Sequence, residues 1–180
     1  MSLMKCLLAA TALTLGLPAA ALAQPAPAAA KSVTADIVGN DGNVVGTATA
    51  TGVEEVTVIR VVLQPGALSP GWHGIHLHAV GDCSDTAKFL ASKGHVNHGS
   101  GALHGLLNPN GPDEGDLPNI YAIADGSVSA EVAREWALFG RNGYLDADGF
   151  ALVIHAKPDD HLSQPIGGAG DRVACAAFKP

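Results

Sequence analysis

Apolar and polar residues alternate over short stretches along most of the chain from residue 32 onward. This period-two pattern predicts β-strands that bury one face and expose the other. The predicted strands are residues 32–38, 44–51, 56–63, 75–79, 120–124, 127–132, 150–156 and 172–178. Turn residues separate several of them, as at Asn40-Asp41-Gly42, Asp125-Gly126 and Asp148-Gly149. About eight short strands of this kind predict an all-β sandwich or barrel.

Three segments depart from this alternation. Residues 129–139 fit a short helix as well as a strand edge, because Glu131, Arg134 and Glu135 occur among alanines. Residues 81–118 and 157–171 have little periodicity and are too long to be simple turns. Long ordered loops on a β scaffold commonly carry functional sites, so these two segments are the candidate functional loops.

The first 23 residues have the pattern of a secretory signal peptide. Lys5 gives a positive start, residues 7–17 are mostly apolar, and Ala21-Leu22-Ala23 is a small-x-small cleavage site. The apolar segment is too short to suit a membrane anchor, and no second run of about 20 apolar residues follows, so we expect no membrane span. We expect an exported protein, periplasmic or extracellular, with a Pro/Ala-rich linker over 24–31 and one domain over 32–180.

Cysteine usage agrees with export. Cys6 belongs to the signal peptide, which leaves Cys83 and Cys175 as an even pair. In an oxidising compartment such a pair is expected to form one disulfide, closing a loop of about 90 residues. The alternative is a pair of thiolate metal ligands, which the chain needs less because histidines and carboxylates already supply enough donors.

The charge balance excludes nucleic acid as a partner. The net charge is −7, and it becomes −8 without residues 1–23, which contain Lys5 and no acid. Binding to nucleic-acid phosphates requires a cluster of Lys and Arg, and the sequence has none. A negative chain also repels small anions at long range, so an anionic substrate would need local positive charge.

Several histidines are placed where their side chains can converge. His76 and His78 are two residues apart on a predicted strand, so they project from the same face. His95 and His104 lie in the first long loop, and His155 lies in an apolar strand. A lone buried histidine is commonly a core residue, whereas imidazoles sharing one face of a rigid element are typical of a metal site.

Seven motifs, in order, make the chain resemble one known family. They are Gly74-Ile75-His76-Leu77-His78, Gly81-Asp82-Cys83, Gly94-His95-Val96-Asn97, His104-Gly105, Gly115-Asp116-Leu117-Pro118, His155 with Asp159-Asp160, and the stretch 167–175 that contains Arg172 and Cys175. On these motifs, residues 31–180 resemble the secreted bacterial copper/zinc superoxide dismutases. The resemblance implies a Greek-key β-sandwich or flattened barrel of about eight antiparallel strands with two long functional loops.

The resemblance also implies a copper site and a reaction. The implied copper ligands are His76, His78, His95 and His155, a set that suits an ion cycling between Cu(I) and Cu(II). His95 is the implied bridge between copper and zinc and carries a proton during turnover, and Arg172 attracts the anionic substrate. The implied activity is dismutation of superoxide to oxygen and hydrogen peroxide, by a monomer or homodimer with copper and zinc as cofactors.

The implied zinc site matches the family only in part. His95, His104 and Asp116 fall on three of its ligand positions. The fourth, three residues before Asp116, is a histidine in the family and Asp113 here. An aspartate can ligate zinc at a distance close to that of a histidine nitrogen, so a two-His, two-Asp site is one interpretation. The other is a weak or empty zinc site.

Four further residues take roles from the resemblance or from their surroundings. Asp159 matches the carboxylate that accepts hydrogen bonds from one copper histidine and one zinc histidine. His73 matches a histidine that braces the backbone. His98 replaces a proline of the family, and we interpret it as a solvated loop residue, with ligation as the alternative. We expect His161 at the surface.

Two functional hypotheses follow from these residues. The first is a copper/zinc superoxide dismutase with an altered zinc ligand set. The second is a copper-binding or metal-buffering protein of the same fold with little activity, which the Asp113 substitution keeps open. A purely structural sandwich would leave the ordered histidines, Arg172 and both cysteines without an explanation.

Overall fold

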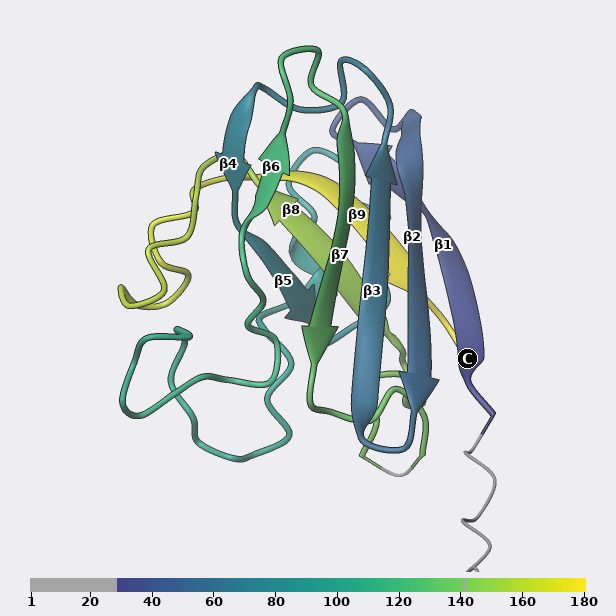
Figure 1. Cartoon of the computed structure of the whole chain (residues 1–180), viewed down its shortest axis with the longest axis vertical. Helices are drawn as coiled ribbons and strands as arrows, with labels where there is room; N and C mark the ends of the chain where they lie inside the picture. Colours follow the sequence, from purple (N-terminus) through teal and green to yellow (C-terminus); the bar gives the residue numbers. More distant parts are fainter. Residues whose placement is uncertain (1–28, 141) are drawn as a thin grey trace, which may run out of the picture.

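Nine strands in two antiparallel sheets make up the described chain (Figure 1). The computed structural model describes residues 29–140 and 142–180. The strands are β1 (Lys31–Gly39), β2 (Val44–Val53), β3 (Val56–Leu63), β4 (Gly71–His73), β5 (Ile75–His78), β6 (Ile120–Ala122), β7 (Val128–Arg134), β8 (Phe150–His155) and β9 (Arg172–Phe178). Within these ranges the only helical element is a single 3-10 turn, η1 (Leu90–Ser92). The all-β prediction is confirmed.

The large sheet has the strand order β5-β8-β9-β1-β2-β3-β7, and β4 pairs with β6 in the small sheet. Figure 1 shows that the large sheet curls, so that β5, β8 and β9 cross behind β3 and β7. The predicted hairpin is β1 with β2, joined by a turn in which Gly39 N donates to Asn43 O. Ser32 and Thr51, and likewise Thr34 and Thr49, exchange hydroxyl hydrogen bonds across this pair.

The hydrophobic core lies between the two halves of the curled sheet. From one half it takes alternate residues of β1, β2 and β3, including Ile37, Ala48 and Ile59. From the other half it takes Ile75 of β5 and Leu152 of β8. The strands β5 and β8 are buried at every position, so their second face is covered as well. The chain that covers this face comes from the two long loops, and the site is built there.

Both long segments remain without strands, as expected, and Figure 1 shows them extending from the same side of the sheet. Backbone and side-chain hydrogen bonds join them. Leu107 N in the first loop donates to His161 O in the second, at 3.1 Å. Gln164 Nε2 in the second donates to His104 O in the first, at 2.7 Å. The two loops therefore form one layer over β5 and β8.

Two details of the strand prediction need correction. The short strand β4 was not predicted, because its three residues are too few to show a period and Trp72 is exposed. The ambiguous stretch 129–139 is a strand up to Arg134, because β7 pairs with β3 along its whole length. The tertiary pairing overrides the helical propensity of its alanines and glutamates.

The first strand begins at Lys31, within the predicted linker. The predicted signal peptide (1–23) and linker residues 24–28 lie outside the described residues. Among the residues that are described, no helix is long and apolar enough to cross a membrane.

Candidate metal centre

Strand β5 supplies the first two histidines of the site. His76 and His78 alternate with Ile75 and Leu77, so the imidazoles face the loop layer while the aliphatic side chains enter the core. All four side chains are fully buried. Because β5 is paired with β8, the two imidazoles start from a rigid backbone.

Main-chain hydrogen bonds bring the first long loop against β5. Val96 N donates to Leu77 O, and Leu77 N donates to Gly115 O, each at 2.8 Å. These contacts set His95 opposite His78 and Asp116 opposite His76 as isolated antiparallel bridges. Gly115 is required at this approach, because a Cβ there would overlap Leu77 O and the His95 side chain. The loop thus presents its own donors beside those of the strand.

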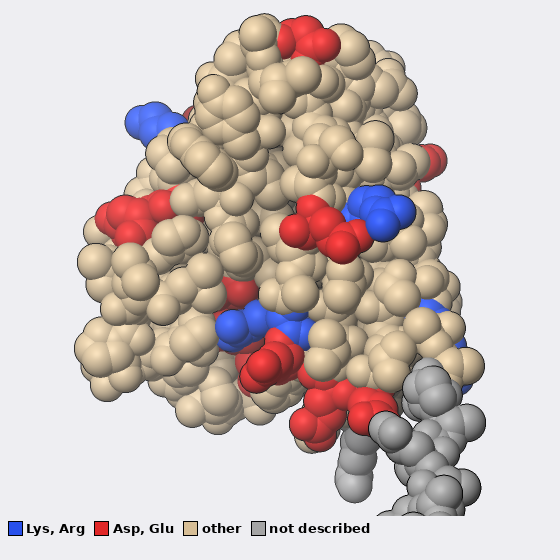
Figure 2. All heavy atoms as spheres, viewed as in Figure 1, with Lys and Arg blue, Asp and Glu red and all other residues tan. Residues whose placement is uncertain are grey.

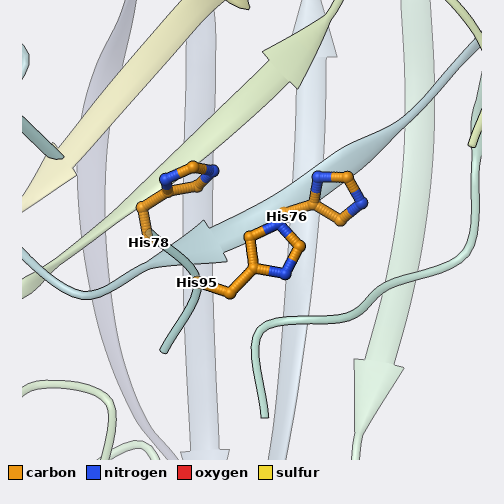
Figure 3. A group of neighbouring side chains, drawn as sticks. All are labelled: His76, His78 and His95. Carbon is orange, nitrogen blue, oxygen red and sulfur yellow. The ribbon is translucent and has the colours of Figure 1, made fainter. Parts of the chain in front are cut away.

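Strand β8 brings the fourth histidine of the predicted copper set. His155 ends β8 and pairs with Arg172 of β9 at a register irregularity between Ile154 and His155. Its ring centroid lies 4.9 Å from that of His76 and 6.1 Å from that of His78. Figure 3 shows His76 and His78 on β5 with the His95 ring turned toward them, and the His76–His95 centroid distance is 4.2 Å. The four predicted rings are therefore gathered in one place.

Each of these four rings has one buried nitrogen without a hydrogen-bond partner. In the described chain, six buried side-chain nitrogens and oxygens lack a partner, and four of them are His76 Nδ1, His78 Nε2, His95 Nε2 and His155 Nε2. Unsatisfied buried polar atoms are rare in folded proteins and costly. Here four such atoms lie on four neighbouring imidazoles, and a metal ion bound between the rings would give each of them a partner.

The second nitrogen of each ring is fixed by the protein. His76 Nε2 bonds to Asp159 Oδ2 at 2.8 Å, and His95 Nδ1 bonds to Asp113 Oδ2 at 2.9 Å. The other two rings bond to main-chain carbonyls: His78 Nδ1 to Lys93 O at 2.8 Å and His155 Nδ1 to Gly170 O at 3.0 Å. Such partners fix the tautomer and the orientation of a ligating imidazole.

A second cluster adjoins the first through His95. The side chains of His95, His104, Asp113 and Asp116 each offer a ligand atom, and these atoms all lie within 4.8 Å of one another. Three of the four side chains are buried, and the carboxylates approach the two rings directly. The structure therefore places Asp113 with the predicted zinc residues. Four N and O donors at this spacing suit a tetrahedral zinc ion.

Asp159 lies between the two clusters. Its Oδ2 bonds to His76 Nε2 at 2.8 Å, and its Oδ1 bonds to His104 Nε2 at 3.2 Å. Asn119 holds its main chain from both sides, accepting from Asp159 N and donating to Asp159 O, each at 2.8 Å. Gly167, with φ of 59°, passes so close that a Cβ would overlap the Asp159 carboxylate. The Asp159 carboxylate thus contacts one ring of each cluster.

Burial and neighbouring carboxylates set the protonation of the rings. Burial lowers the pKa of His76 and of His155 to about 4, and holds the pKa of His78 well below its usual value. Burial also opposes charge on His95, but hydrogen bonds to Asp113 and Asp116 outweigh it and raise the His95 pKa to about 9. Three rings are thus neutral near pH 7, the form that binds metals.

Arg172 reaches the same site from β9. Its guanidinium donates to Phe89 O at 2.7 Å, to Ser92 Oγ at 3.1 Å and to Lys93 O at 2.8 Å. A surface cleft of about 350 Å³ is lined by this arginine together with His78, His95, His104 and Asp113. The guanidinium is therefore both anchored to the first loop and placed where a small anion would approach the histidines.

The disulfide predicted between Cys83 and Cys175 is present. It joins the first long loop to β9, the strand that carries Arg172. Both cysteines pack with Phe89, whose carbonyl accepts one of the Arg172 hydrogen bonds. Thiolate ligation by these cysteines is thereby excluded.

Three further histidines lie around the two clusters. His98 is an exposed loop residue, as expected, and its ring also bonds through Nδ1 to Glu114, a buried carboxylate. It also lies outside the groups of close ligand atoms, against the alternative of ligation. The side chain of His161 is 19 % exposed and faces Asp159, so it is not a free surface residue. By contrast, His73 is buried and bonds to His155 O and Ser69 O, as a bracing residue should.

Some residues that hold the site could not be found by sequence pattern. Glu114, Asn119 and Gln164 act through hydrogen bonds to residues far away in sequence. Lys93 contributes its carbonyl, which any residue type carries. Only Glu114 gave a signal, as a third acid between Asp113 and Asp116.

On the face drawn in Figure 2, basic side chains are few and stand apart from one another among acidic ones. That distribution agrees with the net charge of −7 and shows no basic patch on the described part of this face. Positive charge that could attract an anion is thus local, at Arg172 in the cleft.

Fold and site together define an antiparallel β protein in which two adjoining groups of metal-type donors share one histidine, His95. The family model described as copper/zinc superoxide dismutase (SODC) matches residues 44–178. The chain belongs to the copper/zinc superoxide dismutase family, and the resemblance drawn from the motifs is confirmed.

Individual relatives agree with this assignment. The chain is 45 % identical over 152 residues to a Cu-Zn superoxide dismutase of Caulobacter vibrioides, covering 82 % of this chain and 86 % of the relative. Among solved structures, a SOD-like protein from Bacillus subtilis superposes with a TM-score of 0.73 at 32 % identity, covering 80 % of this chain and 96 % of the other. The Cu/Zn superoxide dismutase from Brucella abortus gives a TM-score of 0.61 at 29 % identity, covering 82 % and 99 %.

Proposed function

We propose that this protein is a copper/zinc superoxide dismutase, with copper at His76, His78, His95 and His155 and zinc at His95, His104, Asp113 and Asp116. Two superoxide anions and two protons give one O₂ and one H₂O₂, so one anion is oxidised and the other is reduced. The observation that carries the proposal is the set of four unpartnered buried imidazole nitrogens, one on each proposed copper ligand. The Caulobacter vibrioides relative, at 45 % identity, is named for the same activity.

The donor set fits copper. Imidazole suits copper in both oxidation states, and the opposite nitrogen of His76, His78 and His155 is already held by a carboxylate or a carbonyl. The opposite nitrogen of His95 faces the proposed zinc cluster. When bound, copper supplies the one-electron oxidation and reduction of superoxide. The protein supplies three neutral rings, because burial keeps His76, His78 and His155 unprotonated near pH 7.

His95 is the residue we assign to proton transfer. Its Nδ1 faces Asp113 and Asp116 in the second cluster, while its Nε2 faces the other three histidines. The proton that this ring holds and releases at Nε2 is therefore delivered beside the cleft, where the reduced oxygen species needs it. In the absence of metal, hydrogen bonds to Asp113 and Asp116 outweigh burial and raise the pKa of His95 to about 9.

The second cluster accommodates zinc with two histidines and two aspartates. This donor set is more negative than one with three histidines, because Asp113 adds a carboxylate. Zinc accepts carboxylate oxygen at nearly the same distance as imidazole nitrogen, so the substitution changes charge more than geometry. Asp159 would hold one ligand of each metal in place from the far side of the rings.

Elemental analysis of the purified protein, combined with a superoxide dismutation assay, tests the proposal. We expect about one copper and about one zinc per chain together with dismutation, and a loss of zinc but not copper in Asp113→Ala. The alternative function, a copper-binding protein with little activity, predicts copper without zinc and a dismutation rate near that of the uncatalysed reaction in solution. A protein that binds neither metal would contradict both.

Substitution of Arg172 should lower the dismutation rate and make that rate less dependent on salt concentration. For Arg172→Gln we expect about a 10-fold loss of dismutation rate at low ionic strength, because the cleft loses its local positive charge. Arg172→Lys should restore part of the rate, since it keeps the charge but not the three-acceptor anchoring. Arg60→Gln on β3, which removes the same charge from a distant exposed ion pair, is the matched control. Equal rates in the two glutamine variants would contradict the role of Arg172.

We also propose that the mature protein is exported, beginning after residue 23. The Cys83–Cys175 disulfide supports this location, because such bonds persist in oxidising compartments. Mass spectrometry of the N-terminus of the protein recovered from a periplasmic fraction tests it, and an uncleaved N-terminus in the cytoplasm would contradict it.

A further inference from the structure

A histidine outside both metal clusters is paired with a buried carboxylate. His98 follows His95 by three residues, and its main-chain N donates to Glu114 Oε2 at 3.1 Å. Its ring Nδ1 donates to the same oxygen. The Glu114 side chain is only 7 % exposed, so these two donors stabilise a carboxylate that would otherwise be costly to bury.

Glu114 sits inside the turn that carries both zinc-type aspartates. Gly115 N donates to Asp113 Oδ1, and Asp113 N donates to Asp116 Oδ2, each at 3.0 Å. The turn is also held from outside at its backbone, because Arg134 Nη2 donates to Asp113 O and Tyr144 OH donates to Glu114 O. The Glu114 side chain adds a link from this turn to the part of the loop just beyond His95.

The partner of Glu114 is itself restrained. The His98 ring is stacked on the indole of Trp136, with centroids 6.0 Å apart and an interplanar angle of 7°. The indole is held in turn, because Trp136 Nε1 donates to Asn142 O at 2.9 Å. Although His98 is partly exposed, its ring therefore has a defined orientation toward Glu114.

We propose that His98 and Glu114 form a clamp that positions the second metal cluster without touching the metal. The clamp joins two points 16 residues apart, next to His95 at one end and between Asp113 and Asp116 at the other. Holding these ends together orders three of the four donors in advance, so less of the binding free energy is lost in organising the loop. The inference rests on the proposed function, because it assigns these residues to the affinity of the zinc cluster.

Titration of copper-loaded, zinc-free protein with Co²⁺ tests the clamp, with the visible absorption of bound Co²⁺ as the readout. We expect His98→Ala and Glu114→Gln each to weaken Co²⁺ binding by about 10-fold, the lower end of what loss of an outer-shell partner costs. The double variant should bind no more weakly than the weaker single variant, because the two residues act as one unit. The electron paramagnetic resonance spectrum of the bound copper should stay unchanged.

Thr57→Val is the matched control for a general loss of stability. The buried Thr57 hydroxyl donates to Trp136 O at 2.8 Å, so this variant loosens the same neighbourhood without removing a partner of Glu114. We expect it to lower the thermal midpoint while Co²⁺ affinity stays within about twofold of wild type.

The outcomes separate the clamp from the proposed function. Co²⁺ affinities in His98→Ala and Glu114→Gln equal to wild type, or an equal loss in Thr57→Val, would overturn the clamp alone. Additive losses of Co²⁺ affinity in the double variant would overturn it as well, because they would show that His98 and Glu114 act independently of each other. A wild-type protein that takes up no Co²⁺ would overturn both the clamp and the proposed zinc site.

Discussion

Replacement of His155 by alanine is expected to abolish dismutation and copper binding while the protein still folds. His155 contributes one of the four unpartnered buried nitrogens and pairs with Arg172 across the strands, so its loss removes one donor of the proposed copper site. We expect an activity loss greater than the roughly 100-fold that removal of an outer-shell partner can cause. Zinc content should remain, because the ligand atoms of the second cluster do not include His155. Elemental analysis, the dismutation assay and far-UV circular dichroism measure these three expectations.

Val153→Ala is the matched control for this experiment. Val153 lies two residues earlier on β8, is fully buried, and packs in the small cluster with Phe89 and Cys175. Its truncation should lower the free energy of unfolding by about 2 kcal/mol and leave copper content intact. If His155→Ala kept its copper and its activity, the copper assignment would fail.

Removal of the disulfide is expected to have the largest effect on stability. Cys83 and Cys175 are separated by 92 residues, so the bond removes a large loop entropy from the unfolded chain. In the chain-entropy model its loss costs about 4–5 kcal/mol. Urea unfolding of the metal-free Cys83→Ser/Cys175→Ser variant, compared with the metal-free wild type, measures this difference without the contribution of metal binding.

The reducing agent dithiothreitol provides an internal check on that comparison. It should lower the unfolding midpoint of wild type toward that of the double serine variant and leave the variant unchanged. In copper- and zinc-loaded protein we also expect the double variant to lose part of the Arg172 effect on rate, because the bond ties β9 to the loop whose carbonyls anchor the guanidinium. A difference in unfolding free energy below about 1 kcal/mol would show that the loop is held without the bond.

The strand pattern predicted most of the fold. Eight of the nine strands were expected near their observed positions, because most are long enough for alternation to show, and β6, although short, lies in the apolar run 120–124 before the Asp125-Gly126 turn. The strand β4 escaped because it has three residues and pairs only with the equally short β6. The curl of the large sheet and the strand order depend on long-range pairing, as between β1 and β9, which no local pattern contains.

The motifs predicted which residues would form the site, because they specify the type and the order of the metal-type side chains. The seven residues expected at the two metals, with Asp159 and Arg172 beside them, are brought together by the fold. The sequence left open whether Asp113 lies beside the predicted zinc residues. The answer depends on the position of Asp113 relative to His95, which is determined by the turn around Gly115. The partner of His98 was unpredictable for the same reason, since Glu114 reaches it across 16 residues of irregular chain.

The contacts of Leu77 with Val96 and Gly115 also bear on what a substitution near them would disturb. Both contacts are made by peptide groups alone, so the pairing of the first loop with β5 does not depend on the side chains at positions 95 and 116. The turn between residues 113 and 116 differs, because its backbone N–H groups donate to the Asp113 and Asp116 carboxylates. Exchanging His95 for another donor would therefore leave the loop backbone in place, whereas exchanging either aspartate would also loosen the turn that carries it.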